Sequence, residues 1–199
     1  MTVEWGTAAA PLPGQTSSGD RGIVVEFPGG ALVAVIDGLG HGVEAEKAAI
    51  AAERVLIATP DALVEELVTR CHHELRGTRG AVLSVASFDA QHDRMSWLGV
   101  GNVEGLLVRG DHEGVTEAVA MRGGTLGYNL PRLTPRTLPI KHGDTLVLAT
   151  DGIRHGFKAE VRSTRSPQEI ANEVAWRWAK TTDDYCVVVA RYAASREAA

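Results

Sequence analysis

Two aspartates each follow a strongly hydrophobic run and precede a glycine. Asp37 ends residues 31–37, Ala-Leu-Val-Ala-Val-Ile-Asp, and Asp151 ends residues 145–151, Thr-Leu-Val-Leu-Ala-Thr-Asp. A carboxylate at the end of a buried strand is costly to desolvate unless a cation or strong hydrogen-bond donors meet it. The glycine after each aspartate allows other groups to approach the backbone closely. Two such Asp-Gly pairs in one small chain indicate two carboxylates directed at one centre, which we interpret as a metal site.

A predicted hairpin brings a third aspartate towards this centre. Residues 22–27 and 31–37 have the β-branched content of strands, and the Pro-Gly-Gly sequence of residues 28–30 predicts a tight turn between them. The start of one antiparallel strand lies beside the end of its partner. Asp20, just before the first strand, should therefore lie near Asp37.

Two further aspartates, Asp183 and Asp184, precede the predicted last strand at residues 185–192. Hard divalent cations such as Mg²⁺ and Mn²⁺ favour the oxygen ligands that such carboxylates supply. No spacing of histidine and cysteine in the chain suits zinc. Two ions about 3.5–4 Å apart can share a bridging carboxylate and activate one water between them. The acidic residues therefore predict a carboxylate site for Mg²⁺ or Mn²⁺.

The glycines after Asp37 also allow other interpretations. Residues 38–42, Gly-Leu-Gly-His-Gly, precede a predicted helix, as a dinucleotide-binding loop does. That fingerprint requires a glycine where Val43 stands, and the Asp37 carboxylate would repel a pyrophosphate unless a metal intervened. Either Asp-Gly pair taken alone is also compatible with a simple turn, whereas the two pairs together favour the metal site.

The composition of the chain excludes several classes of protein. Of its 199 residues, 44% are hydrophobic and 23% are charged, and the net charge is -5, as in an ordinary globular domain. No block rich in lysine and arginine predicts nucleic acid or an anionic membrane as partner. No signal-peptide pattern or membrane span of roughly 18 apolar residues is present in the sequence. We therefore expect a soluble, cytoplasmic monomer whose residues 1–199 form one domain.

The order of the predicted elements favours antiparallel sheets covered by helices. After the hairpin, we expect a helix at residues 42–58 and a second helix that starts at Thr59-Pro60 and ends at Gly77. A capping box at residues 166–169, Ser-Pro-Gln-Glu, predicts the start of a third helix. Neighbouring strands are joined by turns and not by crossover helices, which argues against a doubly wound parallel sheet.

Between the second and third helices, short strands separated by turns predict an antiparallel meander. Its members are residues 81–88, 94–100 and 103–109, and residues 115–121 are the candidate for a further strand. Asn102 lies between two of these strands, and we interpret it as a turn residue.

Five motifs resemble, in sequence and in order, those of the PPM-type (2C-class) serine/threonine protein phosphatases. They are Ser18-Gly-Asp20, Asp37-Gly-Leu-Gly-His-Gly42, Gly99-Val-Gly-Asn102, Thr150-Asp-Gly-Ile153 and Asp183-Asp-Tyr-Cys-Val-Val-Val189. They span nearly the whole chain, and the likeness is greatest to the small bacterial branch that contains the sporulation and stress-response phosphatases. The resemblance implies an α+β fold: a four-layer α/β/β/α sandwich of two antiparallel sheets flanked by helices.

The resemblance also implies two Mn²⁺ or Mg²⁺ ions at one end of the sandwich. Carried over by motif, Asp37 would bridge both ions. Asp151 and Asp183 would complete one ion, and Asp20 and the carbonyl of Gly38 would serve the other. A metal-bound hydroxide would then attack phosphoserine or phosphothreonine directly, without a phosphoenzyme.

The family also provides expectations for partners and for two further residues. Substrates would be phosphorylated STAS-domain proteins of a stressosome, dephosphorylated as negative feedback on a bacterial stress response. Asp184 would be a further metal ligand, ranked after Asp183. The larger relatives carry a histidine, read as a general acid, where this chain has Leu39, so that His41 becomes the candidate acid.

The chain departs from the larger relatives at one more position, because their phosphate-binding arginine has no counterpart in it. Arg21 is the nearest candidate in the sequence. An alternative hypothesis is a non-catalytic phosphoprotein-binding module with the same fold. Chelator-insensitive binding without turnover of any phosphoprotein would favour that alternative.

Overall fold

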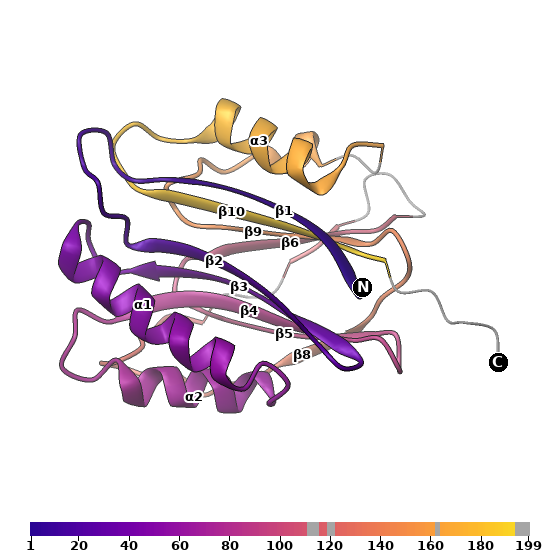
Figure 1. Ribbon diagram of the computed structural model, residues 1–199, viewed down its shortest axis with the longest axis horizontal. Coiled ribbons are helices and arrows are strands. Elements are labelled where there is room, and N and C mark those ends of the chain that lie inside the picture. The colour runs from indigo at the N-terminus through magenta and orange to yellow at the C-terminus, as the bar shows by residue number, and fades with distance from the viewer. Residues whose placement is uncertain (111–115, 119–121, 162–163, 194–199) are drawn as a thin grey trace.

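The computed structural model describes residues 1–110, 116–118, 122–161 and 164–193. One helix, two stacked sheets and two further helices form four layers (Figure 1). The α/β/β/α sandwich of antiparallel sheets is therefore confirmed. The helices are α1 (Val43–Ala58), α2 (Val64–Glu74), the 3-10 helix η1 (Phe157–Glu160) and α3 (Pro167–Trp178). The strands are β1 (Val3–Ala10), β2 (Asp20–Phe27), β3 (Gly30–Gly38), β4 (Ala81–Asp89), β5 (Arg94–Val100), β6 (Glu104–Val108), β7 (Thr116–Glu117), β8 (Arg136–Pro139), β9 (Thr145–Ala149) and β10 (Tyr185–Tyr192).

The two sheets divide the strands in a way that the sequence did not indicate. The upper sheet in Figure 1 has the order β1-β10-β9-β6-β7, and the lower sheet has the order β2-β3-β4-β5-β8. The predicted meander is therefore wrong in its third strand, because β4 and β5 pair but β6 joins the other sheet. Gly101, with a φ of 94°, lies at this crossing, where a Cβ would lie 2.1 Å from Cγ1 of Val82. The further strand predicted at residues 115–121 falls largely outside the described residues, apart from β7.

The predicted hairpin of β2 and β3 is confirmed. Asp20 lies opposite Asp37 in the strand register, and Phe27 lies opposite Gly30. On its other side, β3 pairs with β4. Residues 30–36 are all buried, because helices cover one face of this strand and the upper sheet covers the other. The strand thus leads from the interior of the sandwich to Asp37 at its end.

Small side chains allow α1 to lie close to the lower sheet, since its alanines at positions 45, 48, 49 and 52 are fully buried. The predicted start of α2 at Thr59-Pro60 is wrong. Thr59 ends α1 in a non-helical conformation, and its carbonyl accepts a hydrogen bond from the Ala62 N–H in a turn. The helix begins four residues later at Val64, after Leu63, whose side chain offers no capping oxygen.

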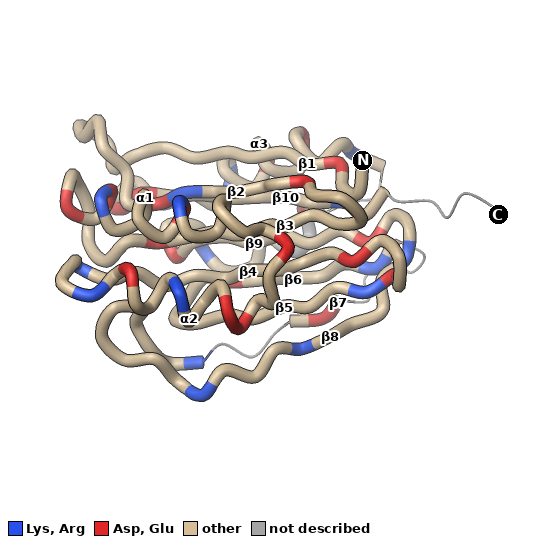
Figure 2. The backbone as a smooth tube through the Cα atoms, turned by 60° about the horizontal axis from the view of Figure 1, so that its bottom comes forward, with Lys and Arg blue, Asp and Glu red and all other residues tan. Residues whose placement is uncertain are grey.

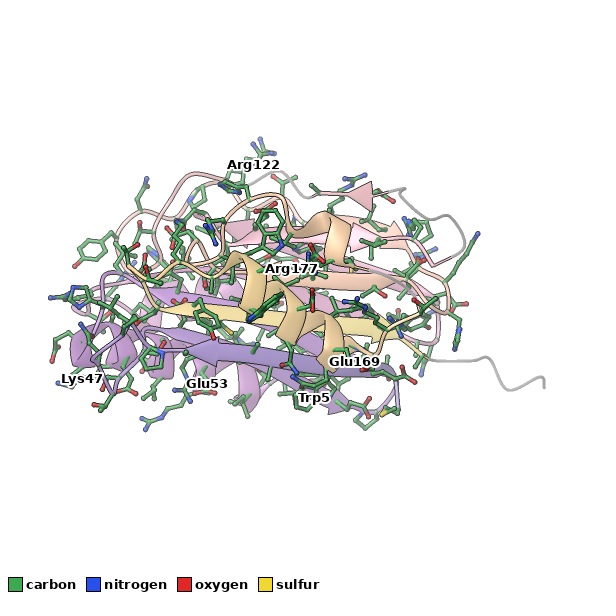
Figure 3. All side chains as sticks on the ribbon, turned by 90° about the horizontal axis from the view of Figure 1, so that it is seen from above. Trp5, Lys47, Glu53, Arg122, Glu169 and Arg177 are labelled. Carbon is green, nitrogen blue, oxygen red and sulfur yellow. The ribbon has the colours of Figure 1, made fainter. Side chains whose placement is uncertain are left out.

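The third helix starts at the predicted capping box. The Glu169 N–H donates to Oγ of Ser166 (3.3 Å), and the Ser166 N–H donates to the Glu169 carboxylate (2.8 Å). Seen from above, α3 lies across the upper sheet (Figure 3). Its residues Ile170 and Val174 are fully buried against that sheet.

The side chain of Gln168 on α3 also reaches the edge strand β1. Its amide donates to the Thr7 carbonyl (2.8 Å) and accepts from the Thr7 N–H (3.2 Å). Gly6 makes this approach possible, because a Cβ there would lie 2.3 Å from the Gln168 backbone. The helix is therefore fixed to the outer edge of the sheet as well as to its face.

Acidic and basic positions are interspersed over the described parts of the two sheets and their helices (Figure 2). Among the described helices, none has the combined length and apolar character that crossing a bilayer requires.

Candidate metal centre

Four strand ends meet at one end of the sandwich, on the left in Figure 1. In the lower sheet β2 starts there and β3 ends there, and in the upper sheet β9 ends and β10 starts there. A pocket of about 300 Å³ lies at this end. It is lined by Asp37, Leu39, Gly40, Val82, Asn102, Thr125, Asp151 and Asp183. Three of the predicted ligands therefore line one pocket, and they come from both sheets.

Asp37 carries the most perturbed carboxylate of the site. Burial, together with the charges of Asp20, Asp151, Asp183 and Asp184, raises the pKa of Asp37 to about 8. None of the described residues donates a hydrogen bond that offsets these effects. A buried carboxylate without a donor or a cation is strongly disfavoured in its ionised form. In this environment a bound cation would favour the ionised form of Asp37.

Asp20, directly across the hairpin from Asp37, has a similar environment. Burial and the charges of the neighbouring aspartates raise its pKa to about 7, although a hydrogen bond with Thr150 acts in the opposite direction. Burial and the charge of Asp151 also raise the pKa of Asp183. The acids of both sheets thus interact electrostatically, as residues around a single centre must.

Asp184 differs from the other acids because backbone groups already satisfy it. Its Oδ1 accepts from the Leu12 N–H (2.7 Å) and its Oδ2 accepts from the Gly19 N–H (2.7 Å). The side chain is almost fully buried. Asp184 directly precedes β10 of the upper sheet, and Gly19 directly precedes β2 of the lower sheet. The side chain of Asp184 therefore fixes the segment that carries Asp20.

Asn102 belongs to the site, although the sequence indicated only a turn. Its Nδ2 donates to Oδ2 of Asp151 (2.7 Å), and both residues line the pocket. The two are 49 positions apart in the chain, so no local pattern connects them. The only signal in the sequence was the Gly-Val-Gly-Asn motif of the resemblance.

The glycines beside the two central aspartates are required by close backbone contacts. A Cβ at Gly38 would lie 2.3 Å from the carbonyl oxygen of Ala45 on α1. A Cβ at Gly152 would lie 1.8 Å from the carbonyl oxygen of Asp184. The Gly38 carbonyl itself lies beside Gly19, where a Cβ would be 2.9 Å from it. Gly19 directly precedes Asp20. The position of the Gly38 carbonyl oxygen is therefore compatible with this oxygen and the Asp20 carboxylate binding the same ion.

Two other candidates from the sequence point elsewhere. His41 is exposed and lies outside the pocket lining, and its Nδ1 is 2.8 Å from Nε2 of Gln15. Nε of Arg21 forms an ion pair with the carboxylate of Glu53 on α1 (2.6 Å). Neither side chain lines the pocket with the three aspartates.

The oxygen atoms of the site suit a hard divalent cation, but the described side chains do not yet surround one ion position. Within the described ranges, no three acidic, histidine or cysteine side chains already surround a point where an ion could sit. Carboxylates of like charge repel one another, so they approach more closely only when a cation neutralises them. Asp20, which is buried, and Asp37, which is partly buried, have no basic partner among the causes that shift their pKa, so a cation would favour their ionised forms most.

Comparison with known proteins agrees with this architecture. The family model of Stage II sporulation protein E (SpoIIE) matches residues 28–193. The chain belongs to this family. The PP2C phosphatase domain of SpoIIE from Bacillus subtilis is 24% identical to it, with a TM-score of 0.78 over 97% of this chain and 64% of that chain. The chain is thus a phosphatase domain of the PPM type, a family whose members depend on metal ions.

Two further relatives are similar over most of their length. The phosphoserine phosphatase RsbX of Bacillus subtilis (strain 168) is 23% identical over 159 residues, 79% of each protein. A crystal structure of RsbX in complex with magnesium has a TM-score of 0.87 and 20% identity, covering 96% of both chains. A chain solved in work on the bacterial stressosome, described as a modular system adapted to control secondary messenger signalling, is 28% identical. Its TM-score is 0.88, and the match covers 96% of this chain and 100% of that chain.

Proposed function

We propose that this phosphatase hydrolyses phosphoserine or phosphothreonine on STAS-domain proteins of a stressosome, as negative feedback on a bacterial stress response. The observation that carries the activity is the convergence of Asp37, Asp151 and Asp183 from two sheets on one pocket. The substrate class is supported by the likeness to RsbX and to the stressosome chain.

The proposed centre holds two Mn²⁺ or Mg²⁺ ions. Asp37 would be a ligand of both ions, Asp151 and Asp183 would be ligands of one, and Asp20 with the Gly38 carbonyl would be ligands of the other. When bound, such ions supply a water of lowered pKa as the nucleophile and neutralise charge on the phosphoryl group. Direct attack by that water requires no covalent attachment of phosphate to the protein.

The remaining residues act by positioning these ligands. Asn102 restrains Asp151 through its hydrogen bond, and Asp184 restrains the segment before Asp20 through two backbone N–H groups. Because both oxygens of Asp184 already accept hydrogen bonds, we assign it first to positioning the other ligands and only second to binding metal. We assign His41, whose Nδ1 lies 2.8 Å from Nε2 of Gln15, to holding the glycine-rich loop and not to protonating the leaving group.

The proposal is tested with a phosphorylated STAS-domain protein and the purified chain in Mn²⁺. Release of inorganic phosphate is measured for the wild type, Asp37→Asn and Asp61→Asn, the last as a control because Asp61 is exposed and lies outside this pocket. We expect turnover by the wild type and Asp61→Asn, and none by Asp37→Asn or after chelation. Full activity in folded Asp37→Asn contradicts the proposal. Binding that survives chelation, without turnover, supports the non-catalytic module instead.

A further inference from the structure

The pocket needs a positive group for its substrate besides any metal ion. A phosphate monoester carries up to two negative charges, and the described lining of the pocket contains three aspartates and no basic residue. Basic residues near its margin are therefore the candidates to contact the phosphate oxygens. Arg21 is already paired with Glu53, and Arg122 lies at the outer margin of the molecule (Figure 3).

Arg79 lies at the edge of this pocket. Its Nη1 is 2.7 Å from the place that a Cβ on Gly40 would occupy, and Gly40 is part of the pocket lining. Its charge also reaches the start of α1, where it adds to the effect of Lys47 in lowering the pKa of Glu44. The guanidinium therefore lies against the same glycine-rich loop that follows Asp37.

The backbone around Arg79 is held in place on both sides. The Gly80 carbonyl accepts from the Leu39 N–H (3.0 Å), which ties the turn directly to the residue after Gly38. On the other side, the Thr78 carbonyl accepts from the hydroxyl of Tyr128 (2.8 Å), and the Gly80 N–H donates to Oγ1 of Thr78 (3.0 Å). A fixed backbone reduces the entropy lost when the side chain binds a ligand.

The side chain of Arg79, by contrast, is available to bind a ligand. It is exposed, and among the described residues no acidic group forms an ion pair with it and no acceptor takes a hydrogen bond from it. A guanidinium presents several N–H donors in a planar fork that matches phosphate oxygens. The position, the fixed turn and the free donors together define a binding group for an oxyanion.

We propose that Arg79 binds the phosphate group of the substrate at the edge of the metal pocket. This inference rests on the proposed phosphatase function, and it assigns the phosphate contact to the connection between α2 and β4, a segment that none of the five sequence motifs includes. The guanidinium donates to phosphoryl oxygens that remain on phosphorus throughout hydrolysis, so it acts both on the substrate and on the inorganic phosphate product.

The test compares Arg79→Ala and Arg79→Lys with Arg76→Ala in the full chain loaded with Mn²⁺. Arg76 is a matched control, because it is exposed in the same connection and its removal changes the net charge equally. The dissociation constant of inorganic phosphate is measured by calorimetry. KM and kcat are measured for para-nitrophenyl phosphate and for a phosphoserine peptide.

We expect Arg79→Ala to weaken inorganic phosphate binding and to raise KM for both substrates by about tenfold or more, as loss of a charge-assisted hydrogen bond does. Arg79→Lys should recover part of this loss because it keeps the charge but not the fork. Arg76→Ala should differ from the wild type by less than about twofold. The affinity for Mn²⁺ and the melting temperature should be the same in all variants.

Two results overturn the assignment. One is phosphate binding by Arg79→Ala that is as tight as that of Arg76→Ala. The other is an increased KM for the peptide alone, which places Arg79 against a residue that flanks the phosphoserine. If the wild type turns over neither substrate, the proposed function fails, but phosphate binding measured by calorimetry still decides the role of Arg79.

Discussion

The two Asp-Gly pairs look alike in the sequence but are held in different ways. Asp37 is part of a strand ladder, with Asp20 opposite it on one side and Val82 on the other. Asp151 follows the end of β9, where a side chain, Asn102, holds it instead of a neighbouring strand. The same dipeptide therefore provides one proposed ligand fixed by backbone pairing and one fixed by a hydrogen bond to its carboxylate.

This difference also changes the electrostatic cost of each residue. No described donor offsets the burial that raises the pKa of Asp37. Asp151 has the amide of Asn102 as a donor. The proposed metal site thus combines one carboxylate whose ionised form is unfavourable without an ion and one that already accepts a hydrogen bond.

Replacing each aspartate by asparagine separates these two roles. Asp37→Asn and Asp151→Asn should both reduce Mn²⁺-dependent hydrolysis by about 1000-fold or more, because several kcal/mol of metal-dependent stabilisation is lost. In the metal-free protein at pH 8, only Asp37→Asn should melt at a higher temperature than the wild type, since it removes a buried acid. Equal melting temperatures for the two variants would remove the distinction.

The stability of the metal-free protein should fall as the pH rises from 5 to 8. Asp20 and Asp37 have pKa values of about 7 and about 8 in the folded protein, against 3.8 for an ordinary aspartate. In this range the folded state binds more protons than the unfolded chain, so raising the pH favours unfolding. We expect a loss of about 2 kcal/mol or more in the free energy of unfolding, measured by urea denaturation. Saturating Mn²⁺ should reverse the trend, and Asp37→Asn should reduce it.

The glycines that follow the two aspartates should be equally intolerant of a side chain. Gly38→Ala and Gly152→Ala should each lower the free energy of unfolding by about 1–3 kcal/mol, because a Cβ at either position meets a backbone carbonyl that cannot rotate away. Gly123→Ala is the control, since a Cβ there meets nothing within 4 Å. Chemical denaturation measures all three. An unchanged Gly152→Ala would mean that the Asp184 backbone can move away from this contact.

Asn102 should contribute to the affinity of the site and less to its chemistry. Removing the partner that orients a metal ligand typically weakens metal binding by about 10- to 100-fold. We therefore expect Asn102→Ala to raise the Mn²⁺ dissociation constant about tenfold, measured by calorimetry. Asn172→Ala, on the exposed side of α3, should leave it unchanged. If Asn102→Ala binds Mn²⁺ normally, the hydrogen bond to Asp151 is not what orients that ligand.

The sequence predicted the parts of the site that depend on local geometry. Asp20 and Asp37 are linked by one hairpin, whose turn fixes the register, so their proximity followed from strand pairing alone. The capping box of α3 is likewise local, because both of its hydrogen bonds join Ser166 and Glu169. The pairing of Asp37 with Asp151 required the motif order of a known family as well as the repeated Asp-Gly pattern.

What the sequence missed depends on contacts between distant segments. After β5 the chain crosses from the lower sheet to the upper sheet, where β6 lies, because Gly101 allows a close passage over Val82. Turn residues alone do not show which sheet the next strand joins. The bond from Asn102 to Asp151 and the approach of Arg79 to Gly40 also join segments far apart in the chain. At Thr59-Pro60 a local pattern was itself misleading. These two residues predict the start of a helix, but they lie in a turn between α1 and α2.

The contact between Gln168 and Thr7 has a consequence for self-association. An edge strand offers unpaired N–H and carbonyl groups, to which another chain can add as a further strand. At Thr7 both groups are already bonded to the Gln168 amide, and the adjoining Gly6 lies against the backbone of α3. A strand from another molecule would have to break two hydrogen bonds and displace a helix before it could pair there. The helix end that stabilises the upper sheet thus also protects its outer edge from aggregation.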